Sequence, residues 1–234
     1  GLSPGFRDIQ VAVARTLPAR GRRKGVEEIA FLTDDLLRSA ERSVYIEAQY
    51  FTAKRLRKTL KKLLSRRRGP EIVVVCTRHA NGFVERFIMG ANRERLLRRI
   101  KRWDRHGRLR IYCPVVDGHE DDGIMLVHAK LMIVDDRFLR IGSANLNNRS
   151  MGLDTECDIV IEGNRPDVRD AIARCRDRLL AEHLDVDPAL VRETMEQENS
   201  LIRTIEKLNR ETGRCLCPLT VKPGRIHSFP GTRL

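Results

Sequence analysis

One stretch in the second half of the 234-residue sequence holds five side chains whose types and spacing could handle a phosphate group. His128 and Lys130 are two residues apart in an apolar run, and Ser143, Asn145 and Glu156 follow them. An imidazole can attack phosphorus or move a proton, while a cation and neutral hydrogen-bond donors can hold the nonbridging oxygens. The set predicts a phosphodiester site in which Glu156 orients His128, as carboxylates orient imidazoles in catalytic triads.

Two strands joined by a tight turn are predicted to carry the first of these side chains. Residues 126–141 place the polar pair Asp135 and Asp136 between two apolar segments, which is typical of a hairpin. Side chains two residues apart on a strand leave the same face of the sheet, so His128 and Lys130 should point the same way. Because an unpaired ammonium is costly to bury, we expect this face to be a site rather than core.

The turn after the second strand should bring further polar groups to the same end of the sheet. Gly142 leaves the backbone unobstructed, Ser143 adds a hydroxyl and Asn145 adds an amide. A helix cap is the alternative role for Asn145, and ordinary turn chemistry is the alternative for Ser143.

The rest of the chain alternates strands and helices, which predicts an α/β protein: a three-layer α/β/α sandwich whose mixed sheet is mostly parallel. We expect residues 1–212 to form one domain and residues 213–234, punctuated by Pro and Gly, to form an irregular tail. Apolar runs predict strands at residues 9–16, 44–48, 71–76 and 109–113, the first of them buried. Apolar residues at helical spacing predict helices at residues 25–42, 83–103, 167–182 and 187–210, and one more that Thr52 caps.

The charge of the chain is strongly positive, with 45 Lys and Arg against 32 Asp and Glu and a formal net charge of +13. This excess favours anionic partners, either nucleic acid or an anionic membrane surface, with a solvated basic face as the alternative. Aromatic residues make up 5% of the chain, which leaves little surface for stacking single-stranded bases. No apolar run is long enough to span a membrane and no signal peptide opens the chain, so we expect a cytoplasmic or peripheral membrane location.

The six cysteines show no pair of CxxC spacings of the kind that binds zinc, and the sequence offers no other metal-ligand cluster. Cys76, Cys113 and Cys157 lie in apolar, strand-like runs, where a free cysteine behaves as a small buried hydrophobe. We therefore expect core thiols of a reducing compartment, and neither a metal nor a cofactor. The chain opens on Gly1 without an initiating Met, and we expect a domain excised from a longer protein.

The predicted site residues resemble the signature of the phospholipase D superfamily. The HKD motif of that family is matched by His128-x-Lys130-x4-Asp135, and its downstream GSxN segment and acidic residue are matched by Gly142-Ser143-x-Asn145 and Glu156. Residues 46–51, IEAQYF, are similar to the IENQYF-type segment in the carboxyl-terminal half of two-motif phospholipases D. Ala48 departs from that pattern, which usually has Asn there. The resemblance covers about residues 9–182.

This resemblance implies a phosphodiesterase with the phospholipase D fold, which hydrolyses or transfers the phosphatidyl group of phospholipids to water or an alcohol during lipid degradation. One motif's histidine forms a covalent phosphohistidine intermediate, and a second motif's histidine protonates the leaving alcohol. By the same resemblance Lys130 and Asn145 bind the phosphate with Ser143 beside them, and Glu156 supports a histidine. Asp135 and Gly142 are structural, and no metal is implied.

The sequence contains one such motif, because the other five histidines lack a lysine two residues on: His79, His106, His119, His183 and His227. The partner motif must then come from an amino-terminal half, which the resemblance favours, or from a second copy in a homodimer. His128 is the general acid/base in the first arrangement and can take either role in the second. Two alternatives stay open: a single-motif homodimeric endonuclease, and a noncatalytic remnant that binds anionic lipid or nucleic acid.

Overall fold

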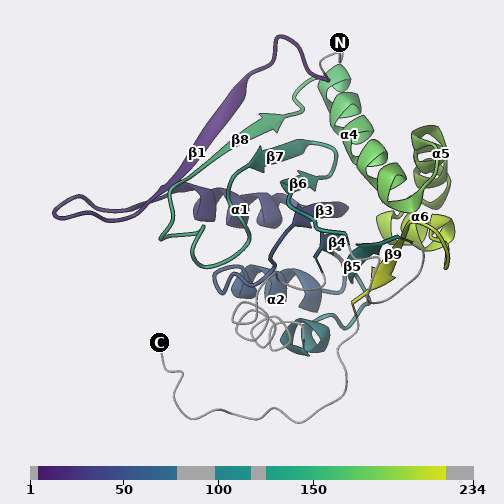
Figure 1. Cartoon of the computed structure of the whole chain (residues 1–234), viewed down its shortest axis with the longest axis horizontal. Helices are drawn as coiled ribbons and strands as arrows, with labels where there is room; N and C mark the ends of the chain where they lie inside the picture. Colours follow the sequence, from purple (N-terminus) through teal and green to yellow (C-terminus); the bar gives the residue numbers. More distant parts are fainter. Residues whose placement is uncertain (1–4, 78–97, 117–124, 220–234) are drawn as a thin grey trace.

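A computed structural model describes residues 5–77, 98–116 and 125–219. Within these residues a nine-stranded sheet has the order β2-β1-β8-β7-β6-β3-β4-β5-β9 (Figure 1). The strands are β1 Val11–Leu17, β2 Val26–Glu27, β3 Ser43–Ala48, β4 Glu71–Cys76, β5 Leu109–Val115, β6 Lys130–Val134, β7 Phe138–Gly142, β8 Glu156–Glu162 and β9 Cys215–Pro218. The helices are α1 Glu28–Ser39, α2 Arg57–Ser65, α4 Pro166–Leu184, α5 Pro188–Glu198 and α6 Leu201–Leu208, and residues 98–103 are also helical.

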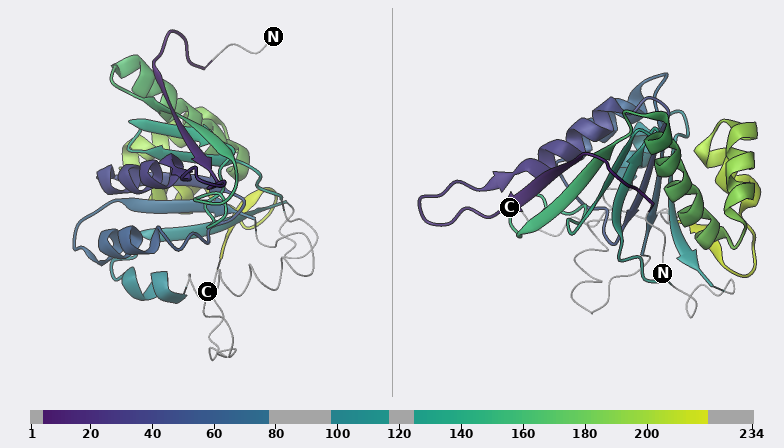
Figure 2. Two further views of the ribbon diagram at one scale, coloured as in Figure 1. Left: turned by 90° about the vertical axis from the view of Figure 1, so that its left-hand side faces the viewer. Right: turned by 90° about the horizontal axis from the view of Figure 1, so that it is seen from above.

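Two helical layers cover the sheet, and β3 and β4 at its centre are accordingly buried on both faces. On β3, Val44 and Ile46 belong to the core beneath α1 and α2, whereas Tyr45 belongs to the core beneath α4, α5 and α6. The two views in Figure 2 place α1 and α4 on opposite sides of the strands. The predicted α/β class and its helix–sheet–helix layering are confirmed. No helix among the described residues is long and apolar enough to cross a membrane.

The sheet is mixed, but the prediction that it is mostly parallel needs correction. The pairs β3–β4 and β4–β5 are parallel, while the other six pairings among the described strands are antiparallel. Helical crossovers give parallel neighbours, whereas short connections such as the turn between β6 and β7 give antiparallel ones. The half of the sheet that holds the predicted site is therefore antiparallel.

Several predicted elements have different bounds in the structure. The single helix expected at 187–210 is broken by Asn199, whose φ of 46° ends α5, and Ser200 then caps α6 by accepting a hydrogen bond from the Arg203 amide at 3.1 Å. Helix α2 begins at Arg57, and Thr52 does not cap it. Of the helix expected at 83–103, residues 83–97 lie outside the described residues.

Both ends of the sheet also correct the sequence predictions. Part of the expected irregular tail is strand β9, which pairs with β5 and places Cys217 opposite Cys113 in the register of the sheet. The predicted first strand is only partly buried, since Val11 and Val13 on β1 are 50% and 58% exposed. The domain boundary at residue 212 stays a prediction.

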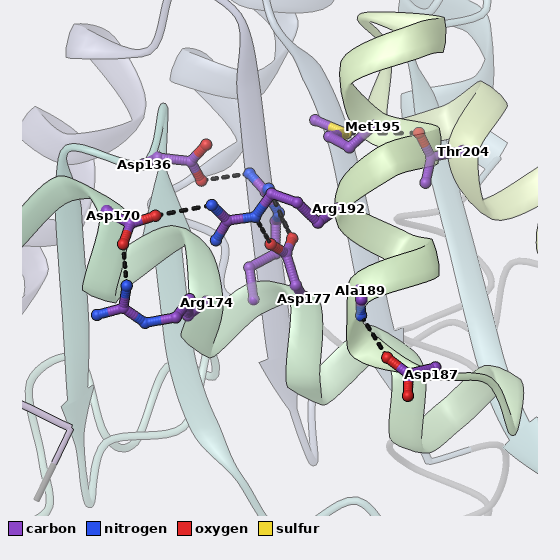
Figure 3. Close-up of polar contacts among 10 residues, drawn as sticks. Asp136, Asp170, Arg174, Asp177, Asp187, Ala189, Arg192, Met195 and Thr204 are labelled. Carbon is purple, nitrogen blue, oxygen red and sulfur yellow. Dashed lines mark hydrogen bonds and ion pairs between the residues drawn. The ribbon is translucent and has the colours of Figure 1, made fainter.

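A chain of ion pairs fastens the hairpin of β6 and β7 to the helices that cover it (Figure 3). Arg176 on α4 is buried and pairs with Asp136 in the hairpin turn and with Asp177 at 2.7 Å. Arg192 on α5 bridges two α4 carboxylates, Asp177 and Asp170, at 2.7 Å each. The turn, α4 and α5 are thus held as one unit.

Candidate active site

The hairpin turn is built from two residues in the left-handed backbone region. Asp135 and Asp136 each have a φ of 53°, and the Arg137 amide donates to the Val134 carbonyl at 2.8 Å. Positive φ at both central residues is the signature of a type I′ turn, whose twist matches a two-residue hairpin. The structure thus contains the hairpin predicted from the Asp-Asp pair.

Asp135 holds this turn against the start of β3. Its carboxylate accepts hydrogen bonds from the backbone amides of Glu41, Arg42 and Ser43 at 2.7, 2.8 and 2.7 Å. Lys130 lies five residues away at the other end of β6, which corresponds to about 16 Å of extended strand. Asp135 is therefore separated from the predicted phosphate-binding groups.

His128 and Lys130 lie where the chain enters β6. The strand begins at Lys130, so His128 precedes it, which corrects the expectation that both belong to one strand. Val127 is fixed to the end of β4, because its amide donates to the Thr77 hydroxyl at 2.9 Å and that hydroxyl donates to its carbonyl at 3.2 Å. His128 is exposed, and among the described residues nothing hydrogen-bonds to its ring.

Lys130 folds back over the histidine backbone. Its ammonium donates a 2.7 Å hydrogen bond to the carbonyl oxygen of His128. Partial burial lowers the pKa of Lys130, and the negative charge of Glu156 opposes that shift. Lys130 therefore lies within the electrostatic reach of Glu156.

Ser143 and Glu156 are joined directly. The Ser143 hydroxyl donates to the Glu156 carboxylate at 2.5 Å and accepts from the Cys157 amide at 3.0 Å. No described hydrogen bond links Glu156 to His128, so the orienting role of Glu156 stays a prediction. Cys157 is exposed, contrary to its predicted core position, because its side chain leaves an uncovered part of the sheet, whereas Cys76 and Cys113 are buried.

Gly142 is required by the close approach of β7 and β8. A Cβ atom at this position would lie 2.1 Å from Asp158 Oδ1 and 2.5 Å from the Asp158 Cα. Since backbone cannot yield as a flexible side chain can, another residue would push the two strands apart. The glycine thus fixes where the segment from Ser143 to Asn145 leaves the sheet.

A buried ion pair that was not predicted from the sequence positions this segment. Arg140 and Asp158 are 4% and 0% exposed at their side chains and approach to 2.5 Å. Asp158 Oδ1 accepts from the Ala144 amide at 3.1 Å, and Arg140 Nη2 donates to the Ala144 carbonyl at 3.4 Å. Arg140 also donates to the Thr33 hydroxyl at 2.8 Å, which ties α1 to the same cluster. The sequence did contain a signal for this pair, because Arg140 and Asp158 each lie within an otherwise apolar strand.

Asn145 is half-buried beside the segment that follows β3. Its side-chain oxygen is buried and accepts no hydrogen bond within the described residues. The Leu146 carbonyl accepts from the Thr52 and Ala53 amides at 2.8 and 2.9 Å, so the chain after Asn145 runs alongside residues 51–53. A buried acceptor without a partner is costly unless a ligand or water supplies a donor.

The structure therefore brings together His128, Lys130, Ser143 and Glu156, with Asn145 on the adjoining turn, and keeps Asp135 apart. The grouping offers an exposed imidazole, a cation and a hydrogen-bonded carboxylate, which are groups that can bind and cleave a phosphodiester. Cavities of about 560 and 660 Å³ occur elsewhere, and neither is lined by His128 or Lys130. The described residues contain no group of three or more His, Cys, Asp or Glu side chains that could hold a metal.

Comparison with known proteins decides the family. Residues 34–178, more than half of the chain, match the family described as "Cardiolipin synthase, PLD-like domain". The chain belongs to this phospholipase D-like family. Phospholipase D alpha 1 of Arabidopsis thaliana is 38% identical over 94 residues, a segment that spans 37% of this chain and 11% of the plant protein. Phospholipase D gamma 3 of the same plant is 33% identical over 119 residues, or 46% of this chain and 13% of the relative.

One solved structure shares the fold, and another aligns less closely. The phosphatidylserine synthase of Haemophilus influenzae aligns with a TM-score of 0.55 and 18% identity, over 72% of this chain and 38% of that protein. Nuc of Salmonella typhimurium, a phospholipase D family member, aligns with a TM-score of 0.46 and 21% identity, over 70% of this chain and 89% of that one. At 18% identity the synthase shows the fold and leaves the substrate open.

Proposed function

We propose that this phospholipase D-like protein is a phosphodiesterase that hydrolyses or transfers the phosphatidyl group of phospholipids. The observation that carries the proposal is the exposed His128 ring beside Lys130, whose ammonium already contacts the His128 backbone at 2.7 Å. The plant phospholipases D to which the chain is similar support a phospholipid substrate.

The proposed reaction proceeds through a phosphohistidine. A histidine ring nitrogen attacks phosphorus, a P–N bond forms, and the P–O bond to the headgroup alcohol breaks as a second histidine protonates the leaving oxygen. That second histidine then takes a proton from water or an acceptor alcohol, whose oxygen attacks phosphorus and breaks the P–N bond. His128 acts as the general acid/base, Lys130 and Asn145 hold the nonbridging oxygens, and Glu156 supports the histidine, with Ser143 as its hydrogen-bond partner.

The nucleophilic histidine, the partner of His128, is proposed to come from an amino-terminal half, with a second copy of this chain as the alternative. A row of apolar side chains near the site supports such a partner: Val13, Ile159 and Ile141 lie in register across β1, β8 and β7. They are 58%, 36% and 43% exposed, although aligned apolar residues on a sheet face are normally covered. Since Ile141 is two residues before Ser143, a half docked on this row would adjoin the site.

A nuclease of the same family is the second candidate, and the net charge of +13 favours it. The two substrates can be separated by offering the complete enzyme phosphatidylcholine and supercoiled plasmid DNA in parallel. We expect release of choline and no nicking of the plasmid. Nicking without choline release would assign the protein to the nucleases, and neither reaction would support a noncatalytic role in binding anionic ligands.

A further inference from the structure

A dense basic surface covers α2 and the helical residues 98–103. It consists of the exposed lysines and arginines of residues 58–68 and 99–105, six on the first segment and four on the second, and is called the basic face below. Residues 58–68 contain no acidic side chain. In residues 99–105 the one carboxylate, Asp104, is engaged by the amides of Arg108 and Leu109 at 2.7 and 3.0 Å.

The two segments of the basic face lie against each other. Arg57 begins α2, and its pKa is lowered first by burial and then by the positive charge of Arg99. Figure 1 and the left view of Figure 2 both show the helical residues 98–103 alongside α2. The positive charges of two separate sequence segments are therefore close together in space.

Charge pairing distinguishes this surface from the opposite side of the sheet. Within the described part of the chain, none of the ten basic side chains of the basic face forms an ion pair, whereas Arg174, Arg176 and Arg192 on α4 and α5 all do. A cluster of unpaired like charges repels itself, and an anionic partner relieves that repulsion. The basic face is thus complementary to a negatively charged surface.

The position of α2 brings the basic face toward the site. The segment that enters α2 is bound to the loop that follows Asn145: Thr52 and Ala53 donate to the Leu146 carbonyl, and the Lys54 amide donates to Asn148 Oδ1 at 2.8 Å. The apolar side of α2, with Leu60 and Leu64, is fully turned into the core. The helix can therefore meet headgroups through its charges without leaving the fold.

We propose that the basic face binds the anionic headgroups of a lipid bilayer and holds the protein at the membrane surface. This inference rests on the proposed phospholipid substrate, because a bilayer is where that substrate lies. A bilayer is favoured over single-stranded nucleic acid because the aromatic side chain of the face, Trp103, packs against the core instead of offering a stacking surface. Each basic residue near an anionic leaflet strengthens binding about five-fold.

Vesicle co-sedimentation of the full chain tests this inference. The triple variant Lys58→Gln, Lys61→Gln, Lys62→Gln removes three charges from α2, and Gln keeps a helix propensity close to that of Lys. The matched control, Arg178→Gln, Arg203→Gln, Arg210→Gln, removes three exposed charges from the side of α4 and α6. Circular dichroism verifies that both variants are folded.

The wild-type chain should bind phosphatidylcholine vesicles that contain phosphatidylserine and not vesicles of phosphatidylcholine alone. The α2 variant should bind the anionic vesicles roughly 100-fold more weakly, while the control should stay within a few-fold of wild type. Equal loss in both variants, or no preference for phosphatidylserine, would overturn the inference. Tighter binding of duplex DNA than of anionic vesicles, lost only in the α2 variant, would assign the basic face to nucleic acid instead.

Failure of this inference is distinguishable from failure of the proposed function. A chain that binds anionic vesicles through the basic face but belongs to an enzyme that cleaves no phospholipid contradicts only the proposed activity. An enzyme that cleaves detergent-dispersed phospholipid, and whose vesicle binding ignores the α2 charges, contradicts only the docking surface.

Discussion

Ala144 is held through both of its backbone groups, and this explains how a short loop keeps Ser143 and Asn145 in place. Asp158 accepts from its amide at 3.1 Å, and Arg140, paired with Asp158, donates to its carbonyl at 3.4 Å. Because the pair is almost fully buried, removing one partner leaves an uncompensated charge in the core. The loop's geometry therefore depends on residues that do not touch a substrate.

The substitution Asp158→Ala should lower the free energy of unfolding by about 3–5 kcal/mol, the usual cost of breaking a buried pair. Asp154→Ala is the matched control, since it removes the partner of Arg149, a largely exposed cation, and should cost at most about 1 kcal/mol. Urea unfolding followed by circular dichroism measures both. Equal effects of the two substitutions would show that the buried pair does not stabilise the fold as described.

The lysine of the site should titrate below the ordinary lysine range. Burial lowers the pKa of Lys130, and Glu156 raises it, so Glu156→Gln should lower the pKa of Lys130 further and bring its deprotonation to lower pH. NMR titration of the Lys130 side-chain carbon reports this directly. Ser143→Ala, which leaves the carboxylate charge in place, serves as the control. A Lys130 titration that does not move in Glu156→Gln would contradict their proximity.

For individual residues, the chemistry of the side chain made part of the candidate site predictable. The candidates His128, Lys130, Ser143 and Glu156 stand out in the sequence because their functional groups and spacing are informative, and the structure brings them together. The Arg140–Asp158 pair could not, because it depends on the register in which Gly142 faces Asp158 across β7 and β8.

Among the elements, the hairpin of β6 and β7 is the one whose position the site depends on most. Its turn is fixed on one side by Asp135, which accepts from three successive amides, and on the other by the Asp136–Arg176 pair. Lys130 is the first residue of β6 and the turn follows its last residue. The turn therefore fixes the position of the strand that carries Lys130.

Replacing Asp135 by Ala should therefore destabilise the protein by about 2–4 kcal/mol, because three successive backbone amides, the partly buried amide of Ser43 among them, lose their acceptor and Ala is strained at a φ of 53°. Asp135→Asn should cost less, since Asn tolerates this backbone region and keeps one acceptor oxygen. Thermal unfolding compares the two variants. If Asp135→Ala leaves stability unchanged but abolishes turnover, the residue is catalytic rather than structural.

Tight turns and long apolar runs were the predictable elements. Strand β4 has the predicted bounds, and the Asp-Asp pair correctly marks the hairpin, because local chemistry dominates there. The prediction of a mostly parallel sheet was wrong, because the alternation of strands and helices along the sequence does not show which strands pair. The break between α5 and α6 was missed because Asn199 adopts a left-handed conformation inside an otherwise helical pattern.

On the molecule as a whole, two surfaces formed by the described residues have no partner within the chain. One is the basic face on α2, and the other is the apolar row of Val13, Ile141 and Ile159. Charge complementarity fits the first to an anionic membrane, whereas aligned apolar side chains fit the second to protein. Composition could predict an anionic partner, but only the sheet order reveals the apolar row.

The substitution Ile159→Glu should weaken the association of this chain with the proposed amino-terminal half or second copy, because it places a charge in the middle of the apolar row. Leu190→Glu on α5 is the control, since Leu190 is similarly exposed at 41% but lies on the helices that cover the opposite end of the sheet. Sedimentation velocity, with the half that carries the second motif added or with this chain alone, measures the complex. Association that survives Ile159→Glu would place the interface elsewhere.

We propose that His128 performs chemistry on a phosphodiester, and the turnover of phosphatidylcholine by the complete enzyme is the measurement that decides this. His128→Ala should reduce turnover by at least about 100-fold, as expected for loss of a catalytic acid/base. His106→Ala, at an exposed histidine without a lysine two residues on, should leave turnover unchanged. Wild-type turnover in a folded His128→Ala enzyme would show that His128 is not a catalytic residue.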